Sequence, residues 1–199
     1  MEEDRHKPRV TNIRVTLFLE KEGVQLMTAK VKEPHFRKIN NFFMVSTSTF
    51  IYTIFPNSDK IGVTRVKQEQ DLACLQAHFV STFCLPTHVV KDTWRIDNIS
   101  ATGSFQKEVN LARLKNLVNE RYKKGSSLFL IQFDRNFRAE AICRTFSIGN
   151  ITLFSSGKYF IVGAKTFSDV HLLVENLFSI IRDGVSLGSE RKKYVHLRK

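Results

Sequence analysis

The sequence predicts an α+β protein built from two similar halves, each a run of antiparallel strands followed by a helix. The chain repeats one phrase, because residues 53–67 are echoed by residues 152–165 with their lysines 98 positions apart. Upstream of each phrase stands a matching Asn-Ile pair, at 12–13 and at 98–99. In both halves a strand-like alternation of apolar and polar residues gives way to helical spacing. Two matched segments in the same order indicate a duplication.

Composition restricts the class of protein. The chain has 199 residues, of which 42% are hydrophobic, so it can bury a core and is expected to fold. Its 31 Lys and Arg residues against 19 Asp and Glu residues give a net charge of +12. Such a charge is typical of a protein with an anionic partner, nucleic acid or an acidic membrane, and also of a solvated basic surface. Three cysteines without a close pair predict neither disulfides nor a zinc site, and the chain is expected to be soluble and intracellular.

In the first half, alternation of apolar and polar residues predicts a strand at 10–19. Gly23 predicts a turn, and Pro34 is expected to end the short element that lies between them. The pattern then predicts an antiparallel meander and a closing helix, with strands at 42–45, 49–55 and 60–66, turns at 46–48 and 56–59, and the helix at 68–82.

In the second half, a strand is predicted at 94–102 and a helix from Leu111, with Asn110 as its N-cap and Gly125 at its end. The last helix carries apolar residues on one face between 170 and 181, with Ser168 as its expected cap and Gly184 just past its end. Between these two helices, strands are predicted at 128–133, 139–146, 151–154 and 158–162.

These elements predict a division of the chain. It consists of a polar leader (1–8), a first repeat (9–83), a linker (84–93), a second repeat (94–183) and a basic tail (184–199). The tail is interpreted as a phosphate contact, a nuclear address or a disordered end.

The strand at 158–162 predicts where a binding surface lies. Tyr159 and Ile161 point to one face of the strand, and Phe160 and Val162 point to the other. If helices cover only one face, the other face is a bare apolar surface, which is typical of a binding site. The alternative is that a partner chain or the tail buries Phe160 and Val162.

The second phrase resembles a known family. Residues 153–158 read Leu-Phe-Ser-Ser-Gly-Lys and residues 162–165 read Val-Gly-Ala-Lys. They are similar to the Ile-Phe-Ser-Ser-Gly-Lys and Thr-Gly-Ala-Lys of the saddle domain of the TATA-box-binding protein family. The first repeat is less similar, because Pro-Asn-Ser-Asp at 56–59 replaces the Ser-Ser-Gly turn and Arg65 replaces the glycine. The resemblance covers residues 9–183 and implies a curved antiparallel sheet, a saddle, with helices on its convex face and the DNA minor groove on its concave face.

The resemblance also implies functional residues. Base contacts carry over to Asn12, Asn98, Thr64 and Val162; wedges that enter base steps carry over to Phe55, Phe42, Phe137 and Phe154; and phosphate contacts carry over to Lys60, Lys67, Arg144, Lys158 and Lys165. Amides can donate to the acceptors of A·T minor-groove edges, and inserted phenylalanines unstack base steps, as minor-groove binders of this family do.

Alternatives stay open for several of these residues. Each phenylalanine could belong to the core, and Phe36 competes with Phe42 for the partner of Phe55. The asparagines could bond a neighbouring strand's backbone. Val162 lacks the family's threonine hydroxyl, which predicts an altered sequence preference. Arg65 could clash with the fold or add a phosphate contact.

The predicted function is a transcription initiation factor that binds and bends double-stranded DNA in the A·T-rich minor groove. The resemblance implies general transcription factors as partners of the convex helices, and a nuclear location or the site of a virus's own transcription. The sequence predicts no cofactor, metal or membrane. The alternative is a saddle-fold protein-interaction module of transcription that has lost DNA bending.

An enzyme is not predicted. The run Ser156-Gly157-Lys158 lacks the upstream glycine and the following helix of a phosphate-binding loop. A repair glycosylase would need a lyase region for which no residues remain.

Overall fold

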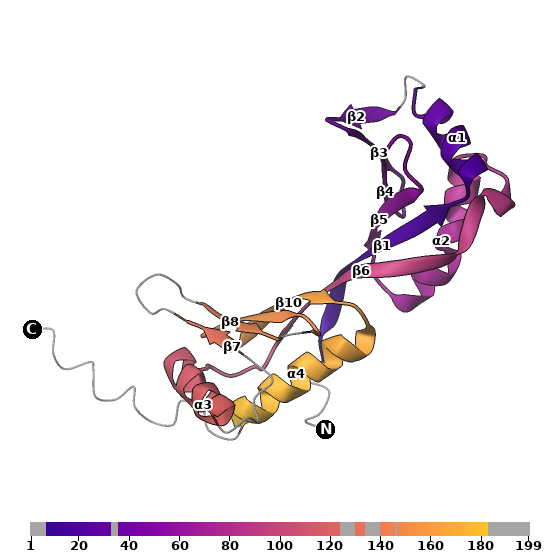
Figure 1. The fold of residues 1–199 in the computed structure, drawn as a ribbon. Helices are drawn as coiled ribbons and strands as arrows, with labels where there is room; N and C mark the ends of the chain where they lie inside the picture. The colour runs from indigo at the N-terminus through magenta and orange to yellow at the C-terminus, as the bar shows by residue number, and fades with distance from the viewer. Residues whose placement is uncertain (1–6, 33–35, 124–129, 134–139, 146, 183–199) are drawn as a thin grey trace, which may run out of the picture. The chain divides into compact units, whose positions relative to one another are not determined.

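The structure is a computed structural model that describes residues 7–32, 36–123, 130–133, 140–145 and 147–182 (Figure 1). The chain divides into two compact units. The first unit is Val10–Ser100, and the second unit is Ala101–Lys199 together with Met1–Arg9. The predicted Gly125, Gly184, Pro34 and Phe137 and the basic tail lie outside the described residues.

The described elements form an α+β fold. The strands are β1 (Arg9–Leu19), β2 (Arg37–Ile39), β3 (Phe42–Ser46), β4 (Ile51–Ile54), β5 (Lys60–Val66), β6 (Val90–Ser104), β7 (Leu130–Gln132), β8 (Glu140–Arg144), β9 (Asn150–Phe154) and β10 (Lys158–Ala164). The helices are α1 (Lys21–Lys30), α2 (Glu69–Thr82), the 3₁₀ helix η2 (Thr87–Val89), α3 (Leu111–Lys123) and α4 (Phe167–Arg182).

The strand order confirms the predicted duplication. One sheet has the order β2-β3-β4-β5-β1-β6-β10-β9-β8-β7. Each repeat contributes a long first strand, β1 or β6, and a four-stranded meander, β2 to β5 or β7 to β10, and the second repeat has the reverse strand order of the first. Within each meander neighbouring strands pair antiparallel, for example β4 with β5 and β9 with β10. The predicted fold class is therefore confirmed, and β2 is a strand that the sequence did not predict.

The first helix shows that the predicted turn at Gly23 is wrong. Gly23 lies in the first turn of α1 and is buried. A Cβ atom at this position would lie 2.6 Å from the carbonyl oxygen of Val89. The glycine therefore permits close packing of α1 against η2, and the helix forms because burial outweighs the weak helix preference of one glycine.

The core of the first unit lies between α2 and one face of the sheet. Ile61 and Val63 of β5 are fully buried, as is Phe79 of α2. The ring of Phe79 lies 5.3 Å from that of Tyr52 on β4, which shows that α2 covers the face carrying these residues. Because side chains alternate along strands, the residues between them point to the other face.

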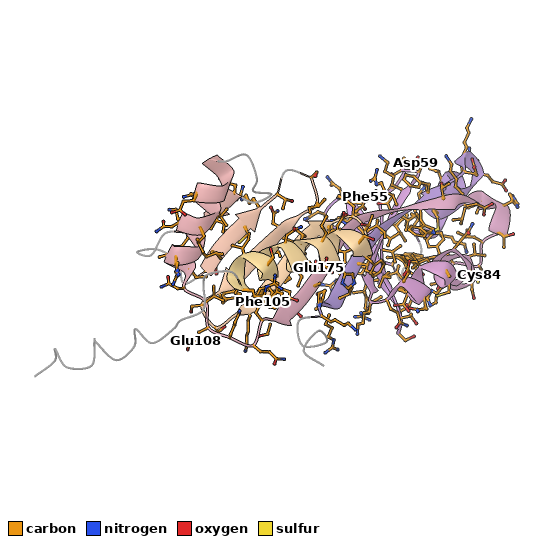
Figure 2. The ribbon with its side chains drawn as sticks, turned by 90° about the horizontal axis from the view of Figure 1, so that it is seen from below. Phe55, Asp59, Cys84, Phe105, Glu108 and Glu175 are labelled. Atoms are coloured by element: carbon orange, nitrogen blue, oxygen red, sulfur yellow. The ribbon has the colours of Figure 1, made fainter. Side chains whose placement is uncertain are left out.

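The second unit repeats this arrangement. Tyr159 and Ile161 of β10 are buried, as are the apolar residues of α4, Val170, Leu173, Leu177 and Ile181. Phe105 joins the two layers, since its ring lies 4.9 Å from that of Tyr159 and 5.9 Å from that of Phe178 on α4 (Figure 2). As predicted, Phe160 and Val162 point away from this core.

Helix caps are also repeated. Asp71 accepts the backbone N–H of Lys67 at the start of α2, and Asp169 accepts that of Lys165 at the start of α4, 3.0 and 3.1 Å away. The cap of α4 is Thr166 and not the predicted Ser168, because the Asp169 N–H donates to the Thr166 hydroxyl at 3.0 Å. The predicted cap of α3 is confirmed.

Candidate functional site

The sheet face of the first unit that lies opposite α2 carries three of the predicted site residues, Asn12, Phe42 and Thr64. Strand alternation and register place on this face Asn12 and Arg14 of β1, Phe42 and Met44 of β3, Ile51 and Thr53 of β4, and Gly62 and Thr64 of β5. We call this set the first open face. Most of these side chains are half-buried, and Arg14 is exposed.

Phe55 follows β4 at the end of the first open face and is 40% exposed. Its ring centroid lies 5.7 Å from that of Phe42, with the two planes tilted by 53°. Phe36, the competing candidate, is only 9% exposed and stacks on Phe83 at 6.0 Å. Phe42 is thus the phenylalanine that the fold brings to Phe55, and Phe36 belongs to the core.

Asn12 is held by the backbone of the neighbouring strand. Its Oδ1 accepts the N–H of Arg65 at 2.9 Å, at a register irregularity between β1 and β5. Its amide NH₂ makes no hydrogen bond with a described residue. The bond to a neighbouring strand's backbone, one of the two alternatives for this asparagine, is therefore present. It fixes the orientation of the amide, and no described residue accepts a hydrogen bond from its NH₂ group.

Arg65 fits the fold without a clash. It adopts φ +70°, and Gly163 at the corresponding position of the second repeat adopts φ +90°. Its side chain is exposed, and Nη1 donates to the carbonyl oxygen of Thr47 at 3.1 Å. Both repeats have a left-handed backbone at this position, and only the second repeat supplies the glycine that adopts it without strain.

Replacing Arg65 by glycine should stabilise the first unit. We expect Arg65→Gly to raise the free energy of unfolding by about 1 kcal/mol, because left-handed backbone costs a non-glycine residue about 1–2 kcal/mol and the exposed bond to Thr47 returns less. Arg65→Ala keeps the strain and loses that bond, so it should lower the stability. Urea unfolding followed by circular dichroism measures both, and equal losses in the two variants would show that the backbone is not strained.

Asn98 differs from Asn12 in its surroundings. It is half-buried on β6, and its Nδ2 donates to the hydroxyl of Ser100 at 2.9 Å. One amide hydrogen is thus engaged within the strand, so the two asparagines are equivalent in sequence but not in the hydrogen bonds that orient them.

The carboxylate beside Asn98 belongs to an ionic cluster. Burial tends to raise the pKa of Asp97, but hydrogen bonds from the Thr16 hydroxyl and the Arg95 guanidinium, with Arg14 nearby, lower it overall. The Arg95 Nε lies 2.8 Å from Oδ1 of Asp97. Asp97 is therefore ionised at neutral pH, and it ties β6 to β1.

The second unit also has a sheet face that points away from its helices. It carries Leu130 and Gln132 of β7, Ile142 and Arg144 of β8, Asn150, Thr152 and Phe154 of β9, and Phe160 and Val162 of β10. We call this set the second open face. Phe154 is 36% exposed and Phe160 38% exposed, so the apolar surface predicted here is open in the described part of the chain. Phe137 cannot be placed, because it lies outside the described residues.

The predicted phosphate-contacting side chains are all exposed. Lys60 and Lys158 begin β5 and β10, Lys67 and Lys165 follow these strands, and Arg144 ends β8. Each lies at or just beyond the end of a strand, where a long cationic side chain can reach an anionic partner.

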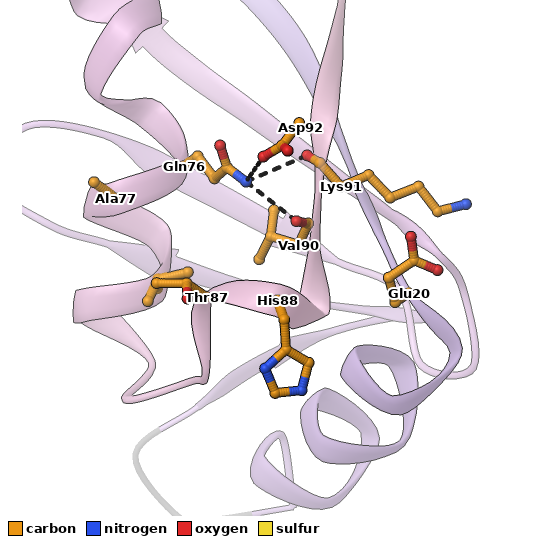
Figure 3. Close-up of a pocket in the computed structure, with 9 residues that line it drawn as sticks. Glu20, Gln76, Ala77, Thr87, His88, Val90, Lys91 and Asp92 are labelled. Carbon is orange, nitrogen blue, oxygen red and sulfur yellow. Dashed lines mark hydrogen bonds between the residues drawn. The ribbon is translucent and has the colours of Figure 1, made fainter.

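Other features of the described residues do not form a competing site. The pocket in Figure 3 lies between α2, η2 and the start of β6 and contains none of the predicted site residues. In it, Gln76 donates to the carbonyl oxygen of Val90 and to Asp92, both at 3.1 Å. Burial raises the pKa of Cys143 to about 12, so this thiol is protonated. No metal-binding cluster and no helix able to cross a membrane occur among the described residues.

Asn150 and Arg14 belong to the open faces but were not predicted from the sequence. Arg14 was detectable, because it lies two positions after Asn12 on the same strand face. Aligning the two repeats places Asn150 at the position equivalent to Ile51. Its pairing with Val162 across the strands depends on the register, which the sequence alone does not give.

Comparison with known proteins agrees with this geometry. Residues 93–184 match the sequence model of the family described as transcription factor TFIID, or TATA-binding protein. No curated protein matches the chain. Among solved structures, the TATA-binding protein of Methanococcus jannaschii is 16% identical, with a TM-score of 0.63 over 89% of this chain and 99% of that chain.

A second solved structure is much less similar. The heterotetrameric sarcosine oxidase from Corynebacterium sp. U-96, in complex with pyrrole 2-carboxylate, is 10% identical over 87% of this chain and 83% of that chain, with a TM-score of 0.25. Residues 93–184 thus match the sequence pattern of the TATA-binding-protein family, and the chain as a whole has the fold of a TATA-binding protein.

Proposed function

We propose that this TATA-binding-protein-related transcription factor binds A·T-rich duplex DNA in the minor groove through its two open faces, and bends it. The observation that carries the proposal is the fixed amide of Asn12 on a sheet face that also exposes Phe55. The family that residues 93–184 match consists of DNA-binding factors without enzymatic activity.

Minor-groove chemistry suits the polar groups of the open faces. A·T and T·A pairs present only acceptors there, the adenine N3 and the thymine O2, whereas guanine adds an amino donor. Asn12 offers donors, because Arg65 occupies its oxygen. Asn98 and the Thr64 hydroxyl add further polar groups, and Val162 adds an apolar one. The first open face should therefore prefer A·T pairs.

The exposed phenylalanines suit insertion between bases. Phe55, supported by the Phe42 ring, and Phe154 are candidates in separate units, with Phe137 as the proposed partner of Phe154. Unstacking a base step costs a few kcal/mol, which the larger contact area of bent DNA repays. These rings are already exposed in the free protein, so moving them into a base stack breaks few contacts within the protein.

The surrounding charges suit the phosphate backbone. Lys60 and Lys67 in the first unit, and Arg144, Lys158 and Lys165 in the second, would contact phosphates on either side of the groove. Factors of the transcription machinery would bind the helices, of which α3 carries the basic residues Arg113 and Lys115. Such a factor acts where transcription takes place, which is the nucleus in a eukaryotic cell.

A binding and bending experiment tests this function. Donor and acceptor fluorophores at the ends of short A·T-rich and G·C-rich duplexes report bending through energy transfer. We expect binding and bending of the A·T-rich duplex only, with log affinity falling against log salt at a slope near −5 if about six phosphates are neutralised. A flat salt response without bending would instead support the protein-interaction module.

A further inference from the structure

One pair of opposed residues differs in kind between the two repeats. In the first unit Thr64 of β5 stands opposite Ile51 of β4. In the second unit Val162 of β10 stands opposite Asn150 of β9. The polar member of the pair is therefore on β5 in the first unit but on β9 in the second. Directly opposed residues of an antiparallel pair lie on the same face of the sheet. The second open face lacks the threonine hydroxyl but carries an amide beside its position.

The surroundings of Asn150 leave its amide uncommitted. The residue is half-buried at the start of β9, and its side chain makes no hydrogen bond with a described residue. Its other cross-strand neighbour is Arg144, which is exposed and belongs to the same face. A half-buried amide that makes no hydrogen bond with the described residues can exchange water for a ligand at little cost.

Gly163 lies beside this amide. The Nδ2 of Asn150 is 4.0 Å from the position that a Cβ atom of Gly163 would occupy. In the first unit the corresponding residue is Arg65, and the residue corresponding to Asn150 is Ile51. The glycine and the asparagine therefore occur together in one repeat and are both replaced in the other.

We propose that Asn150 is a base-reading residue of the second open face, and that it lets this face accept a base pair with a minor-groove amino group. The inference rests on the proposed function. Because no described residue bonds Oδ1 or Nδ2, the amide can turn its oxygen toward the amino group of guanine or its nitrogen toward the acceptors of an A·T pair. Asn12 lacks this choice, since its oxygen accepts from Arg65.

Base analogues test the proposal one position at a time. 2,6-Diaminopurine replaces adenine, pairs with thymine and places in the minor groove the same amino group that guanine carries. Each adenine of a bound A·T-rich duplex is replaced in turn, and the dissociation constant is measured at fixed salt. For the wild-type protein we expect about tenfold weaker binding at the other contacted positions and no more than about twofold at one position.

Variants of Asn150 assign that tolerant position. Asn150→Val should make it as sensitive as the others, about tenfold, because valine cannot accept a hydrogen bond from the amino group. Asn150→Asp offers only acceptors, so diaminopurine should bind better than adenine there. Asn116→Ala, which removes an exposed asparagine from α3, is the matched control and should leave the profile unchanged.

The outcomes separate this inference from the proposed function. If wild type and Asn150→Val bind and bend the A·T-rich duplex with identical diaminopurine profiles, Asn150 does not read bases and only this inference is overturned. If the wild-type protein binds no duplex at all, both proposals are overturned. A tolerant position that disappears in Asn150→Val and inverts in Asn150→Asp supports both.

Discussion

Gly157→Ala should destabilise the second unit by about 3 kcal/mol. Gly157 is the buried residue of the turn between β9 and β10 and adopts φ +80°, and an added Cβ would lie 2.1 Å from the carbonyl oxygen of Lys107. That contact forces apart two segments joined by backbone hydrogen bonds, from Phe105 to Gly157 at 2.9 Å and from Val109 to Ser155 at 2.8 Å. Left-handed strain and the weakened bonds act together, so the melting temperature should fall by roughly 10 °C or more.

A second glycine supplies the control for this prediction. Gly62 lies in β5 on the first open face, and a Cβ there would meet the Thr53 Cβ at 3.4 Å, an ordinary contact. Gly62→Ala should change the stability by less than about 1 kcal/mol in either direction. Thermal and urea unfolding followed by circular dichroism compare the variants. If Gly157→Ala lowers the free energy of unfolding no more than Gly62→Ala does, the turn tolerates a side chain and its contact with Lys107 is not rigid.

The double variant Phe55→Ala/Phe154→Ala should bind the A·T-rich duplex without bending it. Each ring lies at the end of β4 or β9, is exposed, and is not part of the buried core. Without the rings nothing holds the base steps apart, so energy transfer should return to the value of the free duplex. The loss of two aromatic anchors should also weaken binding about 100-fold or more.

Leu172→Ala is the control for the wedge variant. Leu172 is 44% exposed on α4 and therefore has an accessible apolar side chain on a helix instead of an open face. Its removal should leave affinity and bending as in the wild type. Unfolding curves of the double variant identify any effect on folding, which should be limited to about 1 kcal/mol for the lost ring contact between Phe42 and Phe55. Unchanged bending in the double variant would contradict the wedge role.

The two open faces differ in the residues that they carry. The first combines fixed amide donors at Asn12 with Thr64 and the small Gly62, whereas the second presents the large ring of Phe160 at the position that corresponds to Gly62. The second also has Val162 and Asn150 in place of Thr64 and Ile51. The two repeats have thus kept their strand order while the residues of their open faces have diverged, and under the proposed function the two halves of the DNA site would differ as well.

The sequence by itself determined the duplication, the strands around the repeated phrase and the helices α2, α3 and α4. These features depend on local periodicity, on caps a few residues away, such as Asn110, and on comparison of one repeat with the other. The positions of Phe55 and Phe154 at the ends of strands also followed, because each stands in a phrase that the chain contains twice.

Only the tertiary structure decided the roles that depend on distant partners. Gly23 is helical because Val89 packs on it, and Phe42 rather than Phe36 meets Phe55 because Phe36 stacks on Phe83. The orientation of Asn12 depends on the N–H of Arg65, 53 residues further along the chain. Register, ring packing and backbone bonds between remote strands are set by the burial of the whole face, and the local sequence does not specify them.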